Sequence, residues 1–515
     1  MKNKNFTPSL CRLLTVLLIL SMISVSFGGC GIVIIGGNGS ETSGVNAETT
    51  LPESTQAPET EGMGETGNEE VTETPPEDTE EPQETIIFDP AVFPSRLEDA
   101  KKALEALNDT IDISDFDIVL VTAGDTVDVI FAEEDHPLYA ARSNRNSMLY
   151  EKYGVDVATI YENEADTDQI YGDLLAAVQT GSDAEYYVDL LMIPAARAGR
   201  FLSKGLLRDM RSLPFYDTKA GNADGNVGNA RYFDMGAGTD VPEDIYSLYF
   251  NRTLVGKELT DLLYSEALDG SLSFETLLTV ASSLEGLSAD IAVTGGDNSL
   301  PGRISADLLG IEYIKKDRLG VPSIGMTDEE LNVVDSFIEC VSKFRFFTPE
   351  EGGKNSLDRF KEEGVPFYLG TLSDIFELYD DKVEWGLLPL PSEKGLGAIK
   401  ENRPVICLPV TNTRLEQTSL WLTAFNVASE NWIRDQLLAV AIENYIRDNN
   451  SCFTLYRILS QETSPDFTLV YSEYYEGLAD ATYLAAGNAL GGTVKFSETI
   501  KSEIESLNKK LAKLP

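Results

Sequence analysis

The sequence predicts an α/β fold of two lobes, each with a mostly parallel sheet flanked by helices, followed by a helix-rich C-terminal part. Three observations lead to this prediction. Short apolar runs alternate with helical patterns from residue 117 onward, Gly or Pro ends most of the runs, and two apolar extended segments bracket the middle of the chain. Such alternation with short connections is typical of parallel sheets covered by helices, where ligands bind beyond the carboxyl ends of the strands.

The first part of the folded region shows this alternation most clearly. Apolar, β-branched runs predict strands, and runs with apolar residues at helical spacing predict helices. We expect strands at 117–121, 155–160 and 187–193, and helices at 95–107, before Gly154 and at 168–180. This order is β-α-β-α-β after one leading helix.

The second part repeats the pattern and then becomes helical. We expect helices at 274–284 and 328–346, strands at 366–369, 383–388 and 404–410, and mainly helices from 415 onward. Apolar extended segments lie at 245–250 and 405–410. If both cross between the lobes, the first lobe contains about 115–247 plus 412–515, and the second contains about 253–402.

The first thirty residues have the layout of a secretory signal. A basic start precedes the apolar run Leu13–Phe27, and Gly28-Gly29-Cys30 follows. The small pair before Cys30 resembles the lipobox of bacterial lipoproteins, which implies that the cysteine is acylated and anchors the chain to the membrane. The alternative is an uncleaved membrane-spanning helix over 13–35. Both interpretations place the remainder on the extracellular face of the cell membrane.

Residues 31–88 have the composition of a disordered linker. They contain fourteen acidic residues, no basic residue and many Thr, Pro, Gly and Ser. A flexible chain of this length reaches roughly 40 Å, and the like charges extend it further. Such a spacer suits a domain held away from the membrane in a thick cell wall of the Gram-positive type.

The charge excludes several classes of partner. The chain has 85 acidic and 40 basic residues, a formal net charge of −45, and no Lys/Arg-rich run. This charge disfavours nucleic acid and anionic lipid surfaces. It also disfavours anionic ligands, unless arginines cluster locally.

The counts of His and Cys exclude several kinds of catalytic site. His136 is the only histidine and lies in an acidic, solvated loop pattern, so a two-histidine zinc site is excluded. Apart from Cys11 and Cys30, the cysteines are Cys340, Cys407 and Cys452, without metal spacing. We expect them to be small buried residues, although one disulfide is open. We predict no catalytic residue, no metal and no cofactor.

Several segments together resemble the extracellular solute-binding proteins of family 1, the substrate-binding lipoproteins of bacterial ABC importers. They are Arg145-Asn146 before 149–155, the runs 188–191 and 205–214, Tyr249–Arg252, 359–370 and 385–391. The resemblance covers most of 115–460. It implies the two-lobed type II fold of periplasmic binding proteins, a small ligand that is usually a sugar, and delivery to the membrane subunits of an ABC permease. It also implies a monomer without enzymatic activity.

Candidate ligand-binding residues follow the strand ends. They are Asp125, Arg197, Tyr249, Thr371 and Asp374, chosen because sugars are held by flat aromatic rings and by hydrogen-bonding side chains. Each could instead cap the next helix. We expect Trp421 in the core, leave Trp432 open, and consider Tyr474 and Tyr475 either a stacking platform or a surface rim. The segment 221–226 is predicted to be a flexible turn rather than a calcium site.

Two other functions remain open. A surface glycoside hydrolase needs only two carboxylates facing each other across a cleft, roughly 5–10 Å apart, one with a raised pKa. A ligand sensor could use the same two lobes and report occupancy to a membrane receptor instead of a permease.

Overall fold

A computed structural model describes most of the chain from Phe88 onward. The contacts divide the chain into two units, 1–83 and 84–515, and every described residue belongs to the second. The described residues are 88, 97–107, 113, 118–122, 134–155, 157–160, 167–181, 188–210, 213–214, 226–230, 233–238, 242–284, 290–294, 299–311, 314–316, 322–347, 355–362, 364–379, 383–392, 399–400, 404–429, 432–461, 464–465 and 478–511. The predicted signal, Cys30 and the predicted linker up to residue 87 lie outside these ranges. Within them, no helix is both long and apolar enough to cross a membrane.

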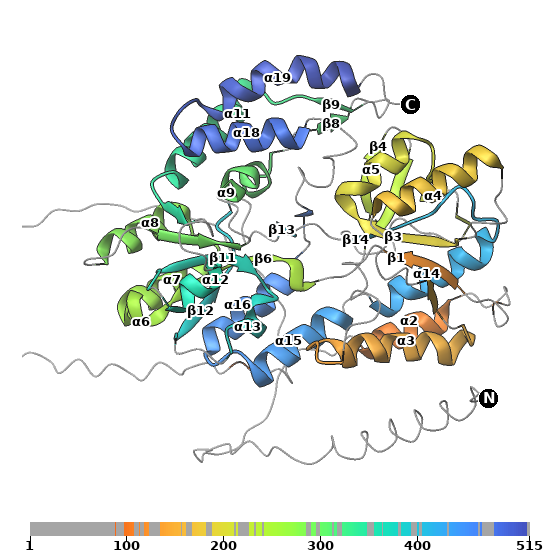
Figure 1. The fold of residues 1–515 in the computed structure, drawn as a ribbon. Helices are drawn as coiled ribbons and strands as arrows, with labels where there is room; N and C mark the ends of the chain where they lie inside the picture. The colour runs from red at the N-terminus through yellow and green to blue at the C-terminus, as the bar shows by residue number, and fades with distance from the viewer. Residues whose placement is uncertain are drawn as a thin grey trace, which may run out of the picture. The chain divides into compact units, whose positions relative to one another are not determined.

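The first sheet has six strands in the order β2-β1-β3-β14-β5-β4. Figure 1 labels β1, β3, β4 and β14 of this sheet. The strands are β1 (Ile118–Thr122), β2 (Val157–Ile160), β3 (Leu190–Pro194), β4 (Asn226–Ala230), β5 (Phe233–Gly238) and β14 (Pro404–Cys407). Strands β1, β2 and β3 are parallel, whereas β14 is antiparallel to β3 and β5. The sheet is therefore mixed, because β14 and β4 run in the opposite direction to β1, β2, β3 and β5.

The second sheet has five strands in the order β10-β7-β11-β6-β12. The strands are β6 (Tyr246–Asn251), β7 (Asp290–Val293), β10 (Arg345–Phe347), β11 (Phe367–Thr371) and β12 (Trp385–Leu388). Here β10, β7 and β11 are parallel, and β6 lies antiparallel between β11 and β12. This sheet is also mixed. The predicted α/β fold class is confirmed for both sheets.

Helices cover both faces of each sheet. On the first sheet, Leu120, Met192 and Ile406 pack with α2, α3 and α14, while Val121 and Leu191 on the other face pack with α4 and α5. Alternate residues of a strand point to opposite faces, so a strand buried on both faces is apolar throughout, as β14 is. These helices are α2 (Leu97–Ala106), α3 (Tyr139–Tyr153), α4 (Thr167–Thr180), α5 (Ala195–Ser203) and α14 (Leu415–Ser429).

The second sheet has the same layered construction. Tyr249 and Leu387 face α12, α13, α15 and α16, whereas Leu248 and Phe250 face helices α7 to α10. The helices of the second sheet and the C-terminal part are α6 (Arg252–Val255), α7 (Lys257–Asp269), α8 (Phe274–Ser283), α9 (Leu300–Arg303), α10 (Ser305–Leu308), α11 (Asp328–Val341), α12 (Ser356–Glu362), α13 (Asp374–Glu377), α15 (Trp432–Asn444), α16 (Asn449–Leu459), α18 (Leu478–Leu490) and α19 (Phe496–Leu511). Two small sheets pair β8 (Ile314–Lys316) with β9 (Pro322–Ile324) and β13 (Ile399–Lys400) with β15 (Ser464–Pro465).

The described elements change from one sheet to the other three times. The short 3-10 helix η4 (Pro242–Asp244) lies between β5 of the first sheet and β6 of the second. The chain returns from β12 to β14, and it leaves again between α14, which packs on the first sheet, and α15, which packs on the second. The two extended segments expected at the crossings are thus the strands β6 and β14, each inserted into the sheet that the chain has just entered.

One predicted helix boundary differs from the structure. The helix expected at 328–346 ends at Val341, because Ser342–Phe344 form a turn and Arg345 pairs with Asp290 of β7. Within the stretch 412–515, α14 packs on the first sheet and α15 and α16 pack on the second, while Ala481 of α18 and Leu507 of α19 belong to a core cluster of the first sheet. Helices α18 and α19, the dark blue pair in Figure 1, contact α11 of the second lobe.

Several residues singled out in the sequence have clear positions. Trp421 is fully buried and stacks on Phe425, as expected, and Trp432 is also buried. Cys407 and Cys452 are buried free thiols, and burial raises the pKa of each to about 12. Cys340 is a free, half-buried thiol. His136 is half-buried rather than solvated: its Nδ1 accepts a hydrogen bond from the Leu138 amide at 3.1 Å.

Candidate functional site

The candidate site lies at the edge of the second sheet where the chain arrives from the first. The parallel strands β7 and β11 end at this edge, and Thr371, the last residue of β11, pairs with Tyr246, the first residue of β6. Helix η4, which precedes β6, lies beside the same turn, since the Ser373 amide donates to the Glu243 carbonyl at 2.9 Å. We call this the crossing edge. Carboxyl ends of parallel strands are where open α/β sheets bind ligands.

Three of the predicted ligand residues meet at the crossing edge. The Tyr249 hydroxyl donates to the Thr371 carbonyl at 2.6 Å, and the Thr371 amide donates to Asp374 Oδ2 at 2.8 Å. The same carboxylate oxygen accepts the Tyr368 hydroxyl at 3.0 Å. The Asp374 side chain therefore closes the turn after β11. Tyr249, Thr371 and Asp374 are hydrogen-bonded to one another through this turn.

The backbone at this turn needs a glycine. A Cβ on Gly370 would overlap the Asp374 carboxylate and the Tyr368 ring. The close approach lets Tyr368 stack near Tyr249, with the ring centroids 5.7 Å apart. Packing and hydrogen bonds thus fix the position of this strand end.

Burial raises the pKa of both Tyr249 and Asp374. Loss of water, followed by the nearby charge of Asp374, holds the pKa of Tyr249 well above its usual value. Burial also raises the pKa of Asp374, against the hydrogen bonds from the Thr371 amide and the Tyr368 hydroxyl, which lower it. The charge of the Glu377 carboxylate also raises the pKa of Asp374. Glu377 is exposed and lies on the same short helix, so the two carboxylates do not face each other across a cleft as a glycosidase pair would.

A buried ion pair adjoins this turn. Arg142 of α3 donates to Glu243 of η4, and the two residues are only 1% and 6% exposed. Within the described part of the chain, Arg142 Nε and Nη1 and Glu243 Oε2 have no hydrogen-bond partner. Helix α3 also carries Leu149 and Tyr153 of the first lobe's core, so the pair ties that helix to the first crossing between the sheets. Leaving one member of such a pair alone is costly.

Sequence reasoning missed Arg142 and Glu243. A signal was present for Arg142, because it occupies the same helical face as Ala141, Arg145 and Leu149, all of which are buried. A basic residue on a buried helical face requires an acidic partner. The partner itself could not be named without the fold.

The remaining predicted site residues lie elsewhere. Arg197 is exposed on α5, the helix that begins where β3 of the first sheet ends. Asp125, Tyr474, Tyr475 and most of the segment 221–226 lie outside the described residues, and Asn226 begins β4. The structure therefore brings together Tyr249, Thr371 and Asp374 and places Arg197 on the other lobe.

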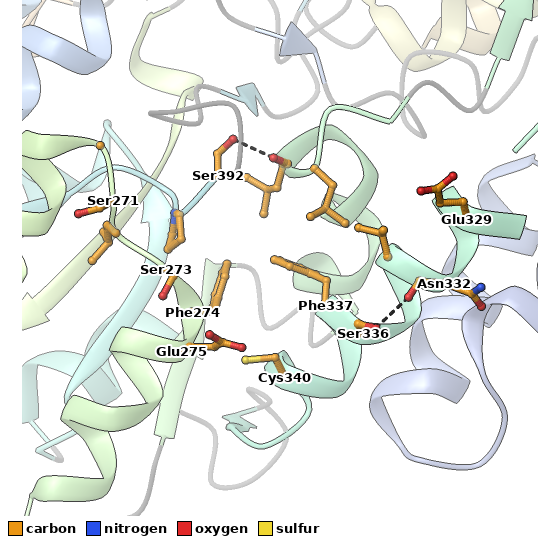
Figure 2. A pocket seen from close by; sticks show the side chains of 16 residues that line it. Ser271, Ser273, Phe274, Glu275, Glu329, Asn332, Ser336, Phe337, Cys340 and Ser392 are labelled. Carbon is orange, nitrogen blue, oxygen red and sulfur yellow. Dashed lines mark hydrogen bonds between the residues drawn. The ribbon is translucent and has the colours of Figure 1, made fainter. Parts of the chain in front are cut away.

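The second lobe also has a cavity of about 830 Å³ between the start of α8 and α11. Phe274 and Phe337 form one wall with an edge-to-face contact at 5.2 Å, and the Ser392 hydroxyl donates to the Leu308 carbonyl at 2.8 Å. Figure 2 shows the Cys340 thiol near Glu275, whose charge adds to burial in raising the pKa of that thiol. None of the predicted ligand residues lines this cavity.

Comparisons with known proteins give structural matches only. No protein-family model and no curated protein matches the sequence. The GacH receptor of Streptomyces glaucescens, solved unliganded and with acarbose, matches over 78% of this chain and 99% of its own, with 13% identity and a TM-score of 0.45. An ABC substrate-binding protein from Listeria monocytogenes, in complex with cycloalternan, matches over 77% and 99%, with 10% identity and a TM-score of 0.47. The maltose/maltodextrin-binding domain MalE from Bdellovibrio bacteriovorus, bound to maltotriose, matches over 77% of this chain and 100% of its own, with 12% identity and a TM-score of 0.45.

Proposed function

We propose that this chain is an extracellular solute-binding protein that captures a small ligand, a carbohydrate, between its two lobes and delivers it to an ABC permease. The observation that carries the proposal is the strand order, in which the chain passes from the first sheet to the second at β6 and returns to the first at β14. Lobes joined by a few crossing segments can close on a ligand as a hinge does. Closure then signals occupancy to a membrane partner, because the ligand stabilises the closed state only through contacts to both lobes.

The site residues divide into two roles in this proposal. Asp374, Thr371 and Tyr249 hold the turn at the crossing edge of the second lobe in one geometry, with Gly370 allowing the close approach. Arg197, exposed at the carboxyl end of β3, and Asp125 contact the ligand from the first lobe. Polar side chains that converge on a largely preformed edge suit hydroxyl-rich ligands.

The proposed location follows from the N-terminal sequence. The signal-like segment exports the chain, acylation of Cys30 anchors it to the membrane, and the acidic residues 31–88 act as a tether. The protein is proposed to act as a monomer without enzymatic activity.

The experiment is a thermal-shift screen of the chain from residue 31 onward against oligosaccharides, polyols and peptides, followed by a product assay on every hit. Saturable stabilisation with unchanged ligand is the expected result. Conversion of the ligand would move the function to a glycoside hydrolase. Failure of all three ligand classes to stabilise the chain would contradict the proposal.

A further inference from the structure

A second cavity, of about 480 Å³, lies at the opposite edge of the second sheet from the crossing edge. Strand β6 begins at the crossing edge and ends at Asn251, which pairs with Trp385 at the start of β12. The residue after β6 is Arg252, and both Arg252 and Trp385 line the cavity. The predicted ligand residues Tyr249, Thr371 and Asp374 do not line this cavity, although Trp385 packs edge-to-face on Tyr249 with the ring centroids 5.7 Å apart. We call this the far edge.

Two arginines contribute to this cavity. Arg447 Nη2 donates to the Tyr379 carbonyl at 2.9 Å, and its guanidinium lies 5.6 Å from the centroid of the Tyr379 ring. Among the described residues, the structure gives Arg447 no ion pair. Its remaining N–H groups are therefore available to a ligand.

The positive charge of Arg252 is only partly compensated by a nearby carboxylate. Its Nη1 lies 3.8 Å from Asp448 Oδ2, beyond hydrogen-bond distance, and its Nε is buried without a hydrogen-bond partner among the residues that the structure describes. The Arg252 side chain is 31% exposed, so part of the guanidinium remains accessible. Glu384 also lines the cavity, but it is exposed at the rim, and its carbonyl accepts the Arg252 amide at 2.7 Å.

This pair differs from several other arginines of the chain. With 85 acidic and 40 basic residues, carboxylates are abundant, and other arginines use them: Arg142 pairs with Glu243, Arg200 with Asp168 and Arg414 with Asp189. An acidic protein binds an anion only where arginines gather, because the overall field is repulsive. The far edge is a place where two guanidinium groups line one cavity.

We propose that the far edge is a binding site for a small soluble organic anion. Arg252 and Arg447 hold its phosphate or carboxylate group, and its body lies against Tyr379 and Trp385. Arginine binds both groups through paired charge-assisted hydrogen bonds. The cavity is larger than an inorganic ion requires, and Tyr379 is 45% exposed and offers an aromatic surface. This inference does not depend on the proposed sugar site.

The test measures the thermal shift of the chain from residue 31 onward with phenyl phosphate, inorganic phosphate and phenol at constant ionic strength. We expect saturable stabilisation by phenyl phosphate, a weaker effect of phosphate and none of phenol. Arg447→Gln should weaken the binding of phenyl phosphate at least about tenfold, which is the effect of losing a charge-assisted hydrogen bond. Arg457→Gln is the control, because it removes the same charge from helix α16, which begins just after Arg447, at a position outside the cavity.

A second variant separates binding from folding. Arg252→Gln should weaken the binding of phenyl phosphate in the same way as Arg447→Gln. The melting temperature of each variant without ligand reports whether it is folded. The proposal is overturned if phenyl phosphate does not stabilise the wild-type chain, if phenol stabilises it equally, or if both arginine variants bind as the Arg457→Gln control does.

Discussion

The two edges of the second sheet use polar groups in opposite ways. At the crossing edge, Asp374 accepts from Thr371 and Tyr368, and Tyr249 donates to the Thr371 carbonyl. At the far edge, Arg447 has no ion pair among the described residues and Arg252 has only a distant one. A polar group bonded within the protein fixes geometry, whereas one that the fold leaves unbonded is available to a ligand. The crossing edge thus positions the lobes, and the far edge offers binding capacity.

The largest expected effect comes from breaking the buried pair beside the crossing edge. Arg142→Met leaves the Glu243 carboxylate buried without its counter-charge, which should cost about 3–5 kcal/mol of unfolding free energy. Chemical denaturation measures it. The double variant Arg142→Met/Glu243→Leu should recover most of the loss, since no isolated charge remains.

The matched control for that prediction is Lys509→Met, which breaks the exposed pair between Lys509 and Glu505. This change should have little effect. An Arg142→Met variant as mild as the control, or a double variant as unstable as the single one, would show that the buried pair does not hold the crossing.

A smaller effect is expected from Gly370→Ala. The added methyl group would overlap the Asp374 carboxylate and the Tyr368 ring, so we expect a loss of about 1–3 kcal/mol in the free energy of unfolding. Gly487→Ala is the control, because nothing lies within 4 Å of the new Cβ in helix α18. The control should gain about 0.5–1 kcal/mol from better helix propensity. Equal effects of the two substitutions would contradict the close packing at Gly370.

Asp374→Asn tests the same turn through its dependence on pH. Burial raises the pKa of Asp374 above its ordinary 3.8, so the folded chain favours the protonated carboxyl. The stability that the protonated Asp374 carboxyl contributes is fully present below the pKa that this group has in the unfolded chain. It is lost as pH rises through the higher pKa that the group has in the folded chain. The melting temperature of the variant relative to wild type should therefore rise over that interval. A difference that stays constant, or that falls with pH, would refute the raised pKa.

The smallest change in stability is expected at the far edge. Tyr379→Leu removes the ring beneath the Arg447 guanidinium, and because Tyr379 is 45% exposed we expect a change within about 0.5 kcal/mol. Phenyl phosphate binding, followed by calorimetry, should nevertheless weaken. A large loss of stability without any loss of binding would mean that Tyr379 serves the fold alone.

Much of the fold could be predicted from the sequence, because the strands and helices carry their own patterns. Helix α11 begins at Asp328 as expected, after a capping box in which Thr327 and Glu330 bond each other's backbone amides. Its end could not be predicted, because the pairing of Arg345 with Asp290 of β7 decides it. The direction of β6 and β14 within their sheets also depends on contacts between distant segments.

The candidate site could be predicted only in part. Tyr249, Thr371 and Asp374 were found because each lies at or near a strand that reaches one edge of the sheet. That they bond one another was not visible, since those bonds depend on the close approach at Gly370. Arg252 and Arg447 are far apart in the sequence, and only the packing of α16 beside β12 brings them to one cavity.

Lobe closure tests the proposed function most directly. Fluorescent labels at Val178→Cys on α4 and Leu262→Cys on α7, both exposed positions, would report the distance between lobes after Cys340, Cys407 and Cys452 are replaced. With a saturating amount of the oligosaccharide that gives the largest thermal shift, the distance between labels should shorten. A bound oligosaccharide that leaves this distance unchanged would contradict capture by closure.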